Sequence, residues 1–566
     1  MEKSTKSNES RRSKAKESRS IRERRLMKVF GLIAFILCIL ASRLFYIQLI
    51  KGEEYNKRAF EQWFHVIGNI PDRGTIYDRN GNPLTDKIQE DYLTLESGFY
   101  LNDKNIDVIS KLTDIEKDRI LKIVPKEKKV ELLIKNYDKA LIMDILKNRG
   151  AATIRRTRRY DEGGLASHVI GYINKSKNIG VSGLEKAFDD ELGENRGKKV
   201  GAILDAQNRI IPGFGYIVME KKDVIKRNLI TTLDSEVEKI CEEELDKNNY
   251  IGSIVVLDAK TGDVLAMTSR PNFNQDNVGE HLESNKKELY NKAIQISYPP
   301  GSVFKIVVAA ALLENDTIKL QDNLVCEGFE MLGVNMIKCN AYERGGHGEL
   351  TFEEAFARSC NSAFIQGAIS LGGEKLMETF EKFGIGQKTG IRINEETSGN
   401  SPTMDYVKGP GIGNVAIGQG TVEVTPLQVA RFTNIIANDG IDVGVRLVKS
   451  IADDNGKIIN EFDDREINRV ISSDTSNKIK KMMKKVVDEG TGQRARLGRV
   501  ESYGKTGSAQ AVGLDGETVH AWFTGFFLGK KSEYVITVIV EDKRSGGRIA
   551  TPIFAKVAQR MMEKGL

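Results

Sequence analysis

Net positive charge is lacking over most of this chain. The first 28 residues hold eleven Lys or Arg against four Glu, a net charge of +7, whereas the whole 566-residue chain sums to +6. Residues 29–566 therefore carry about −1 in total, the difference between these two values. Proteins that bind nucleic acid concentrate basic residues where they contact phosphates. The body of the chain is therefore not expected to bind nucleic acid.

Long apolar runs are also scarce, and the first one lies directly after the basic tail. Val29 to Ile50 spans 22 residues, which at about 1.5 Å per residue crosses a hydrocarbon layer of roughly 30 Å. Arg43 interrupts the run near its outer end, where its stem can snorkel, and no small-residue cleavage site follows. The uninterrupted part ends at Ser42, which leaves a buried helix or a signal-peptide core as alternatives. We expect an uncleaved anchor, with residues 1–28 in the cytoplasm and residues 51–566 outside the membrane.

Internal repeats are absent from the C-terminal part of the sequence, and 566 residues exceed one ordinary domain. Residues 51 to about 225 combine β-rich pieces with charged helices, and their composition shows nothing catalytic. The pattern changes at 225–235, where a β-branched run meets a helix with its N-cap at Asp234 or Ser235. We therefore expect a tail at 1–28, an anchor at 29–50, a first domain at 51–228 and a second at 229–566.

The stretch "YPPGSVFKIVVAAALLE", beginning at Tyr298, places a serine and a lysine at the start of an apolar helical run. The Pro-Pro-Gly before Ser302 cannot continue a helix from upstream, so a new helix begins near this serine. Lys305, three residues on, lies on the same side and can bring its amine to the Ser302 hydroxyl. The helix N-terminus and burial both disfavour an ammonium, which lowers the lysine pKa toward that of a useful base. The pair can activate a serine nucleophile without histidine, although Ser-x-x-Lys alone also arises by chance.

Two further stretches extend this pattern. "ARSCNSAF" places Ser359, Cys360 and Asn361 at the end of a helical run. "SYGKTGSAQAV" places Lys505 and Thr506 on an apolar strand, followed by a glycine that lets a substrate backbone approach closely. The order Ser-x-x-Lys, Ser-x-Asn, Lys-Thr-Gly resembles the penicillin-binding protein and serine β-lactamase superfamily.

The resemblance covers the chain from the anchor to the C-terminus. "NKAIQISYPPGSVFK", "GHGELTFEEAFARSCNSAF", "AIGQGTVEVTPLQVARFTNIIANDG", "VVDEGTGQRA" and "KTGSAQ" followed by "AWFTGFF" are similar to class B, monofunctional penicillin-binding transpeptidases. Upstream, "IPDRGTIYDRNGNPL", "RRTRRYDEGGLASHVIGYI" and "GVSGLEKAFDDEL" are similar to the N-terminal pedestal of that class. Ser508 departs from the pattern, because Thr often follows Lys-Thr-Gly, but the hydroxyl is retained.

This resemblance implies a fold and a first chemical step. The fold is α+β, with a central antiparallel sheet flanked by helices in a membrane-anchored transpeptidase domain, preceded by a β-rich pedestal or dimerisation-like domain. Ser302 would attack the D-Ala-D-Ala carbonyl of a peptidoglycan stem peptide while Lys305 takes its proton. The oxyanion would sit between the backbone N–H groups of Ser302 and Ser508.

The resemblance also implies roles for the other motif residues. Ser359 would pass the proton to the leaving amine, and Asn361 would hold the substrate amide. Lys505 and Thr506 would hold the terminal carboxylate, and Gly507 would leave room for the substrate backbone. An amine of a neighbouring stem peptide would then resolve the acyl-enzyme, and β-lactam antibiotics would acylate the same serine. No cofactor is required for this chemistry.

A second group of residues lies between the first two motifs. Cys326, Cys339 and His347 form a Cys-x12-Cys-x7-His pattern that can supply three ligands to a structural zinc ion. Asp322, four residues before Cys326, would share its face on a strand and is preferred as the fourth ligand, with Cys360 as the competitor. A disulfide between Cys326 and Cys339, or free buried thiols, are the alternatives. A closed metal site would brace the segment leading into Ser359.

Other functions share some of these features. A β-lactamase needs a base that positions water, and no Glu-x-x-Leu-Asn element lies between Asn361 and Lys505. A β-lactam sensor needs a cytoplasmic domain, whereas 28 residues precede the anchor. A non-catalytic scaffold would not need every motif residue. Residues 51–225 do not resemble a glycosyltransferase, so a polytopic membrane glycosyltransferase of the SEDS family is the expected partner.

Overall fold

The computed structural model describes most of the chain. The chain divides into two compact units. The described residues are 3–70, 73–96, 99–125, 129–148, 150–175, 177–193, 198–203, 216–219, 226–282, 284, 286–513, 516–542 and 545–566. Unit 1 comprises Met1–Ile70, Asp91–Arg155 and Lys198–Lys221, and unit 2 comprises Pro71–Glu90, Arg156–Gly197 and Lys222–Leu566. Parts of the segment between the anchor and residue 228 thus cluster with each unit, and the expected division between residues 228 and 229 stays a prediction.

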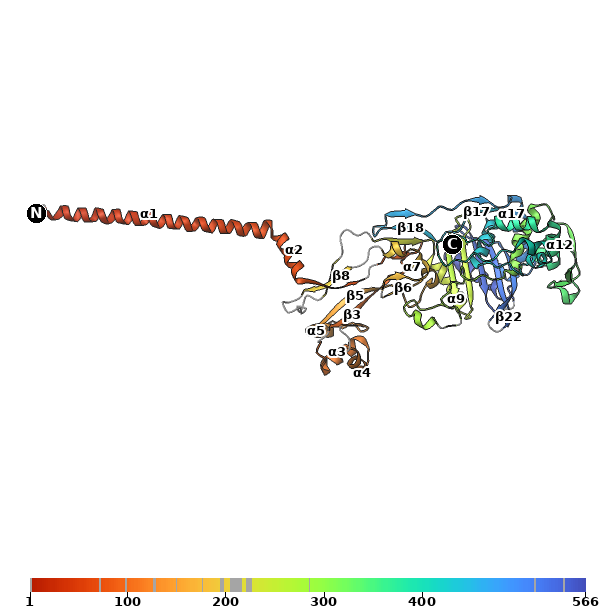
Figure 1. Ribbon diagram of the computed structural model, residues 1–566, viewed down its shortest axis with the longest axis horizontal. Coiled ribbons are helices and arrows are strands. Elements are labelled where there is room, and N and C mark those ends of the chain that lie inside the picture. The colour runs from red at the N-terminus through yellow and green to blue at the C-terminus, as the bar shows by residue number, and fades with distance from the viewer. Residues whose placement is uncertain are drawn as a thin grey trace. The chain divides into compact units, whose positions relative to one another are not determined.

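Unit 1 begins with the apolar helix. Helix α1 (Lys3–Phe45) continues into a π-helical turn (Tyr46–Ile50), and Figure 1 shows α1 as one long helix at the N-terminal end. Arg24–Ile50 is 27 residues long with a mean hydropathy of 2.3, and its most apolar part is not buried against the described chain. Its length and composition suit a single membrane span.

The remainder of unit 1 contains three-stranded sheets and short helices. One sheet has the order β1-β8-β9 and the other the order β4-β3-β5. Their bounds are β1 Phe64–Ile70, β8 Lys198–Ile203, β9 Tyr216–Met219, β4 Lys129–Leu133, β3 Ile88–Glu96 and β5 Ala151–Arg158. Helices α2 (Gly52–Trp63), α3 (Asp103–Thr113), α4 (Lys117–Ile123) and α5 (Lys139–Ile145) complete this part. The mixture of strands and charged helices agrees with the composition of this region.

A buried ion network joins separate segments within unit 2. The Glu185 carboxylate pairs with Arg73 at 2.5 Å and with Arg159 at 2.7 Å, and Arg159 also pairs with Asp86 at 2.6 Å. The Glu185 and Arg73 side chains are almost fully buried. Because a buried charge that loses its partner is costly, this network links the segment Pro71–Glu90 to the segment Arg156–Gly197. Small elements surround it, namely β2 (Ile76–Tyr77), α6 (Ser167–Ile170), β6 (Ile173–Asn174), β7 (Ile179–Gly180), α7 (Gly183–Ala187) and α8 (Asp189–Gly193).

The main sheet of unit 2 is five-stranded and antiparallel. Its order is β12-β11-β23-β22-β21, with bounds β11 Gly252–Asp258, β12 Val264–Arg270, β21 Ser502–Gly513, β22 Gly516–Leu528 and β23 Glu533–Val540. A second sheet has the order β19-β18-β10-β2, with β10 Asn228–Thr231, β18 Val448–Ala452 and β19 Ile458–Glu461. Strand β21 is an edge of the main sheet, so one side of its backbone has no strand partner there.

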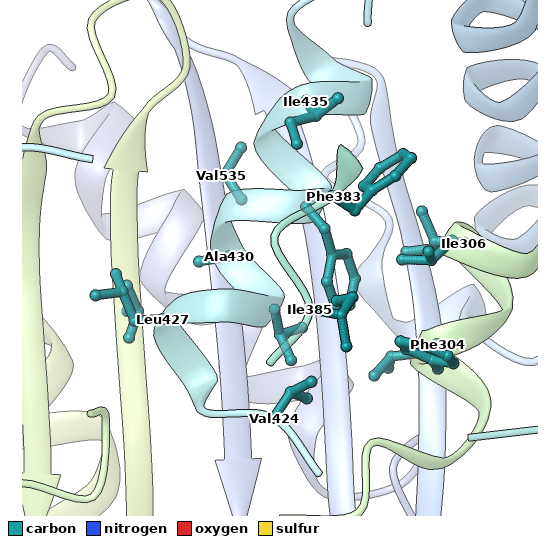
Figure 2. Packing of buried hydrophobic residues seen from close by; sticks show 14 of the residues in the cluster. Phe304, Ile306, Phe383, Ile385, Val424, Leu427, Ala430, Ile435 and Val535 are labelled. Carbon is teal, nitrogen blue, oxygen red and sulfur yellow. The ribbon is translucent and has the colours of Figure 1, made fainter. Parts of the chain in front are cut away.

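Helices pack around the main sheet. Their bounds are α9 Ser235–Asp246, α10 Lys305–Glu314, α11 Phe352–Ala357, α12 Asn361–Leu371, α13 Gly373–Lys382, α14 Met404–Lys408, α15 Gly411–Ala416, α16 Pro426–Ala437, α17 Ser473–Asp488 and α18 Ala550–Glu563. Helix α16 begins with a capping box between Thr425 and Gln428 and a proline in its first turn. Figure 2 shows Leu427, Ala430 and Ile435 along this helix, with Val535 of β23 near Ala430.

Helix α10 is buried on every side. Residues 305–313 are all buried, from Lys305 to Leu313. Alanines and branched aliphatic residues fill this helix, which therefore packs into the core all round rather than presenting one apolar stripe. The expected α+β fold, with a central antiparallel sheet flanked by helices, is confirmed. The core surrounding α10 therefore fixes the positions of the residues at the N-terminus of this helix.

Candidate active site

Ser302 lies in a short 3-10 helix, Gly301–Phe304, that leads directly into α10. Gly301 has a φ of 55°, and a Cβ added to it would lie 3.1 Å from the Ser508 carbonyl oxygen. A residue with a side chain would therefore be strained here and would push this turn away from β21. Glycine thus lets the serine approach the edge strand of the main sheet.

Lys305 is the first residue of α10 and is fully buried. Its Nζ donates to the Ser359 carbonyl oxygen at 2.9 Å, to the Ser359 Oγ at 3.4 Å and to the Asn361 Oδ1 at 2.7 Å. Burial lowers the pKa of Lys305 to about 8. Among the hydrogen bonds of the described residues, the amine is bound by the second motif and not by the Ser302 hydroxyl.

Ser359 occupies a strained position between α11 and α12. Its φ is 56°, in the left-handed region that a residue with a side chain adopts at some cost. This conformation turns both its carbonyl and its hydroxyl toward Lys305. Asn361 is the first residue of α12, and its side-chain Nδ2 donates to the Lys338 carbonyl oxygen at 2.9 Å. The turn between the two helices therefore holds three acceptors around one buried amine.

Lys505 approaches the same hydroxyl from β21. Its Nζ donates to the Ser359 Oγ at 2.9 Å and to the Thr506 carbonyl oxygen at 3.2 Å. Burial, and then the charge of Lys305, lower the pKa of Lys505 well below its usual range. The Ser359 hydroxyl is thus shared by two buried amines whose charged forms repel each other, an arrangement suited to passing a proton.

These residues meet at one cleft of about 530 Å³. Six of the eight residues predicted for catalysis and substrate binding line it, namely Ser302, Ser359, Asn361, Thr506, Gly507 and Ser508. Lys305 and Lys505 lie buried beneath it. A serine nucleophile, two amines of lowered pKa and an edge strand that can pair with an extended peptide support acyl transfer.

The cleft also contains residues that the motifs did not identify. Thr491 is within 2.6 Å of Thr506, hydroxyl to hydroxyl, and Arg494 and Arg548 line the cleft beside them. The stretch "VVDEGTGQRA" carries Thr491 and Arg494, so its similarity to the family was a signal for them. Arg548 lies in no stretch singled out from the sequence.

The cysteines and the histidine of the second group also come together. The ligand atoms of Cys326, Cys339, His347 and Cys360 all lie within 4.8 Å of one another. The His347 Nδ1 is 3.5 Å from the Cys326 sulfur and 3.6 Å from the Cys339 sulfur, and the Cys339 and Cys360 sulfurs are 3.9 Å apart. Tetrahedral zinc with bonds of about 2.3 Å to sulfur and 2.0 Å to nitrogen separates its ligands by roughly 3.5 to 3.8 Å. The donor set and its spacing fit that ion.

The structure departs from the preferred fourth ligand and from the disulfide alternative. Asp322 is not part of it, because it precedes β13 (Asn323–Cys326) and its carboxylate accepts from the Lys319 N–H at 2.8 Å. Cys360 takes the fourth place, since its position as N-cap of α12 brings its sulfur beside Cys339. The alternative disulfide is not formed either, because Cys326 and Cys339 are both free.

The cluster of three cysteines and one histidine is joined to the turn at Ser359–Asn361 by a backbone hydrogen bond. The Asn361 N–H donates to the Cys339 sulfur at 3.3 Å. A hydrogen bond with the Cys360 thiol, and further ones from backbone N–H groups, lower the pKa of Cys339. The sulfurs therefore lie directly behind the turn that carries Ser359 and Asn361.

Comparisons with known proteins agree with this geometry. Residues 252–559 match the penicillin binding protein transpeptidase domain, and residues 69–213 match the penicillin-binding protein dimerisation domain. The chain is 31% identical to Stage V sporulation protein D of Bacillus subtilis over 563 residues, covering 95% of this chain and 85% of that protein. It is 27% identical to the peptidoglycan D,D-transpeptidase MrdA of Acinetobacter baumannii over 94% of this chain and 87% of that protein.

Solved structures show the same fold. Penicillin-binding protein PBP2 from Helicobacter pylori superposes with a TM-score of 0.68 at 24% identity, covering 88% of this chain and 99% of that one. PBP3 from Mycobacterium tuberculosis in complex with aztreonam superposes with a TM-score of 0.62 at 24% identity, covering 87% and 96%. The domain matches and the full-length relatives lead to one conclusion: the chain belongs to the class B penicillin-binding protein transpeptidases.

Proposed function

We propose that this chain is a D,D-transpeptidase that cross-links peptidoglycan stem peptides through an acyl-enzyme on Ser302. The observation that carries the proposal is the buried hydrogen-bond network of Lys305, Ser359, Asn361 and Lys505 beside Ser302 in one cleft. Relatives of similar length are named peptidoglycan D,D-transpeptidases.

Acylation of Ser302 is the first step. The Ser302 Oγ attacks the carbonyl between the two D-alanines, and its proton passes to the neutral amine of Lys305. Backbone N–H groups of Ser302 and Ser508 stabilise the oxyanion, each of them worth roughly 3 to 4 kcal/mol in the transition state. The Ser359 hydroxyl relays a proton to the leaving amine, and its contacts with both lysines support that role.

Binding of the substrate places the scissile bond at Ser302. Thr506 and Lys505 hold the terminal carboxylate, and Asn361 holds the peptide amide. Gly507 lets β21 pack closely against the turn that carries Ser302: a Cβ there would lie 3.0 Å from the Val303 and Trp522 side chains. A second stem peptide then brings its amine to the ester and forms the cross-link. β-Lactams acylate Ser302 because they mimic the scissile dipeptide.

We also propose that Cys326, Cys339, His347 and Cys360 hold a structural zinc ion. Four protein ligands leave no position for a reactive water, so the ion would supply no chemistry to the reaction. These residues would brace the Ser359–Asn361 turn, and the hydrogen bond from Asn361 to the Cys339 sulfur supports that link. The transpeptidase reaction itself needs no cofactor.

The apolar helix supports a place for the protein at the cell membrane. Arg24–Ile50 would cross it once, with the basic tail in the cytoplasm and residues 51–566 outside, where stem peptides lie. The N-terminal region matches a dimerisation domain, which supports a separate partner protein for glycan polymerisation. A polytopic SEDS-family glycosyltransferase is the partner that we propose.

Acylation of Ser302 is tested by measuring the intact mass of the full-length protein in detergent, with and without a fluorescent penicillin. One stable adduct is expected on the wild-type chain and none on Ser302→Ala. Absence of an adduct together with intact drug would mean an idle site and a scaffold protein. Absence of an adduct together with hydrolysed drug would mean a β-lactamase. Native spectra of the same samples report bound zinc.

A further inference from the structure

The cleft carries positive charge that the proposed donor chemistry does not use. Arg494 and Arg548 line it on the side of Thr506, and no Asp or Glu lines it among the residues that the structure describes. Both side chains are exposed, and within the described part of the chain neither guanidinium forms an ion pair. The buried arginines Arg73 and Arg270 of the same unit, by contrast, pair with carboxylates. Two unpaired guanidiniums at the mouth of a cleft without acids favour an anionic ligand.

The two arginines come from different segments that meet beside Thr506. A Cβ on Gly547 would lie 2.8 Å from the Thr491 carbonyl oxygen and 3.8 Å from the Thr506 Cγ2. The Arg494 Nη1 is 3.5 Å from the Arg548 carbonyl oxygen. The segments that carry Arg494 and Arg548 therefore meet beside Thr506, at the end of the cleft where the departing residue and its carboxylate would lie.

The second half of the reaction must use this same end. The amine that leaves and the amine that enters bond to the same acyl carbon, so microscopic reversibility requires the acceptor to approach along the path of departure. The neutral acceptor nitrogen forms an amide bond to the acyl carbon and the ester bond to Ser302 breaks. One amine proton then ends on the Ser302 Oγ. An acceptor that carries a carboxylate beside its amine would meet both arginines on this path.

We propose that Arg494 and Arg548 select the acceptor: an α-amino acid centre with its carboxylate free, rather than an amine with no carboxylate nearby. This inference rests on the proposed transpeptidase function. Arginine suits the task because its planar guanidinium binds a carboxylate through two parallel hydrogen bonds. By the same reversibility the arginines also face the carboxylate of the departing residue, beside Thr506 and Lys505.

The test uses the full-length protein in detergent with an N-acyl-D-alanyl thioester as donor. D-alanine and D-alaninamide are offered as acceptors, because they differ at the carboxylate. The ratio of the two amide products is compared between wild type and variants, so the intrinsic reactivity of each amine cancels. Arg494→Gln and Arg548→Gln are each expected to lower the preference for D-alanine about tenfold, the scale of one charge-assisted hydrogen bond. Arg494→Lys and Arg548→Lys should retain part of it.

Arg496 provides the matched control, because it lies two residues from Arg494 and its side chain donates to the Val487 carbonyl oxygen at 3.1 Å instead. Arg496→Gln should leave the product ratio unchanged. An unchanged ratio in both arginine variants would overturn the proposal. A wild-type chain that forms no penicillin adduct would remove the transpeptidase function itself.

Discussion

The Nζ of Lys305 lies 2.7 Å from the Oδ1 of Asn361, which joins the first catalytic motif to the second across 56 residues of sequence. The amine is buried, and the amide oxygen is one of three acceptors around it. An amine in this position is held ready beside Ser302 and Ser359 at the floor of the cleft.

Acylation of Ser302 is expected to depend on pH through Lys305. Burial lowers the lysine pKa to about 8, and the neutral amine is the form that accepts the serine proton. The acylation rate should therefore rise with pH, fall about tenfold per unit below the midpoint, and level off above it. Stopped-flow measurement with a fluorescent penicillin between pH 6 and 10 checks this. A rate that stays flat over that range would assign the proton transfer to another group.

Asn361→Ala is expected to slow acylation by about 10- to 100-fold. A hydrogen bond to a charged or polarised group contributes roughly 1.5 to 3 kcal/mol, and this change removes the acceptor that lies closest to the Lys305 amine. Asn315→Ala is the control, because that side chain donates to the Ala311 carbonyl oxygen at the other end of α10. Equal rates in both variants would show that Asn361 does not orient the amine.

The amount of bound zinc is expected to depend on Cys360 and not on Asp322. Cys360→Ser removes one of four clustered ligand atoms, so it should lower bound zinc well below one ion per chain and reduce the melting temperature. Asp322→Asn should keep both, since that carboxylate accepts from the Lys319 N–H. Native mass spectrometry and thermal unfolding report the two quantities. A wild-type protein that is stable and binds no metal would refute the zinc site.

Gly546→Ala is expected to damage the edge of the cleft. A Cβ on Gly546 would lie 2.1 Å from the Gly507 carbonyl oxygen and 2.4 Å from that of Trp522, and backbone atoms cannot move aside easily. We expect a loss of roughly 1 to 3 kcal/mol in unfolding free energy, together with slow acylation. Gly279→Ala is the control, because nothing lies within 4 Å of its added Cβ. Denaturant unfolding and penicillin binding measure both effects, and matching stabilities would contradict the expectation.

Several elements could be predicted from the sequence because local interactions determine them. The helix expected after Asp234 begins there, and the Asp234 side chain accepts from the Glu236 and Val237 N–H groups. Capping bonds of this kind span two or three residues and leave a direct trace in the sequence. The apolar helix at Arg24–Ile50 is likewise a matter of composition and length.

The tertiary structure decided which distant groups meet. The position of Asp322 relative to Cys326 suggested a shared strand face, but the strand begins one residue later and Cys360 lies nearer in space. The amine of Lys305 is held by Ser359 and Asn361 because the strained backbone at Ser359 turns its oxygens inward. Arg548 reaches the cleft only through the fold of the segment after β23.

By itself the sequence determined the order of the three catalytic motifs, the buried character of α10 and the apolar N-terminal helix, since each depends on neighbouring residues. The tertiary structure alone decided that Cys360 is the fourth member of the cysteine and histidine group, that two lysines share the Ser359 hydroxyl, and that two arginines line the cleft. Contacts between segments separated by tens or hundreds of residues arise from the packing of the whole core, and a local pattern does not encode them.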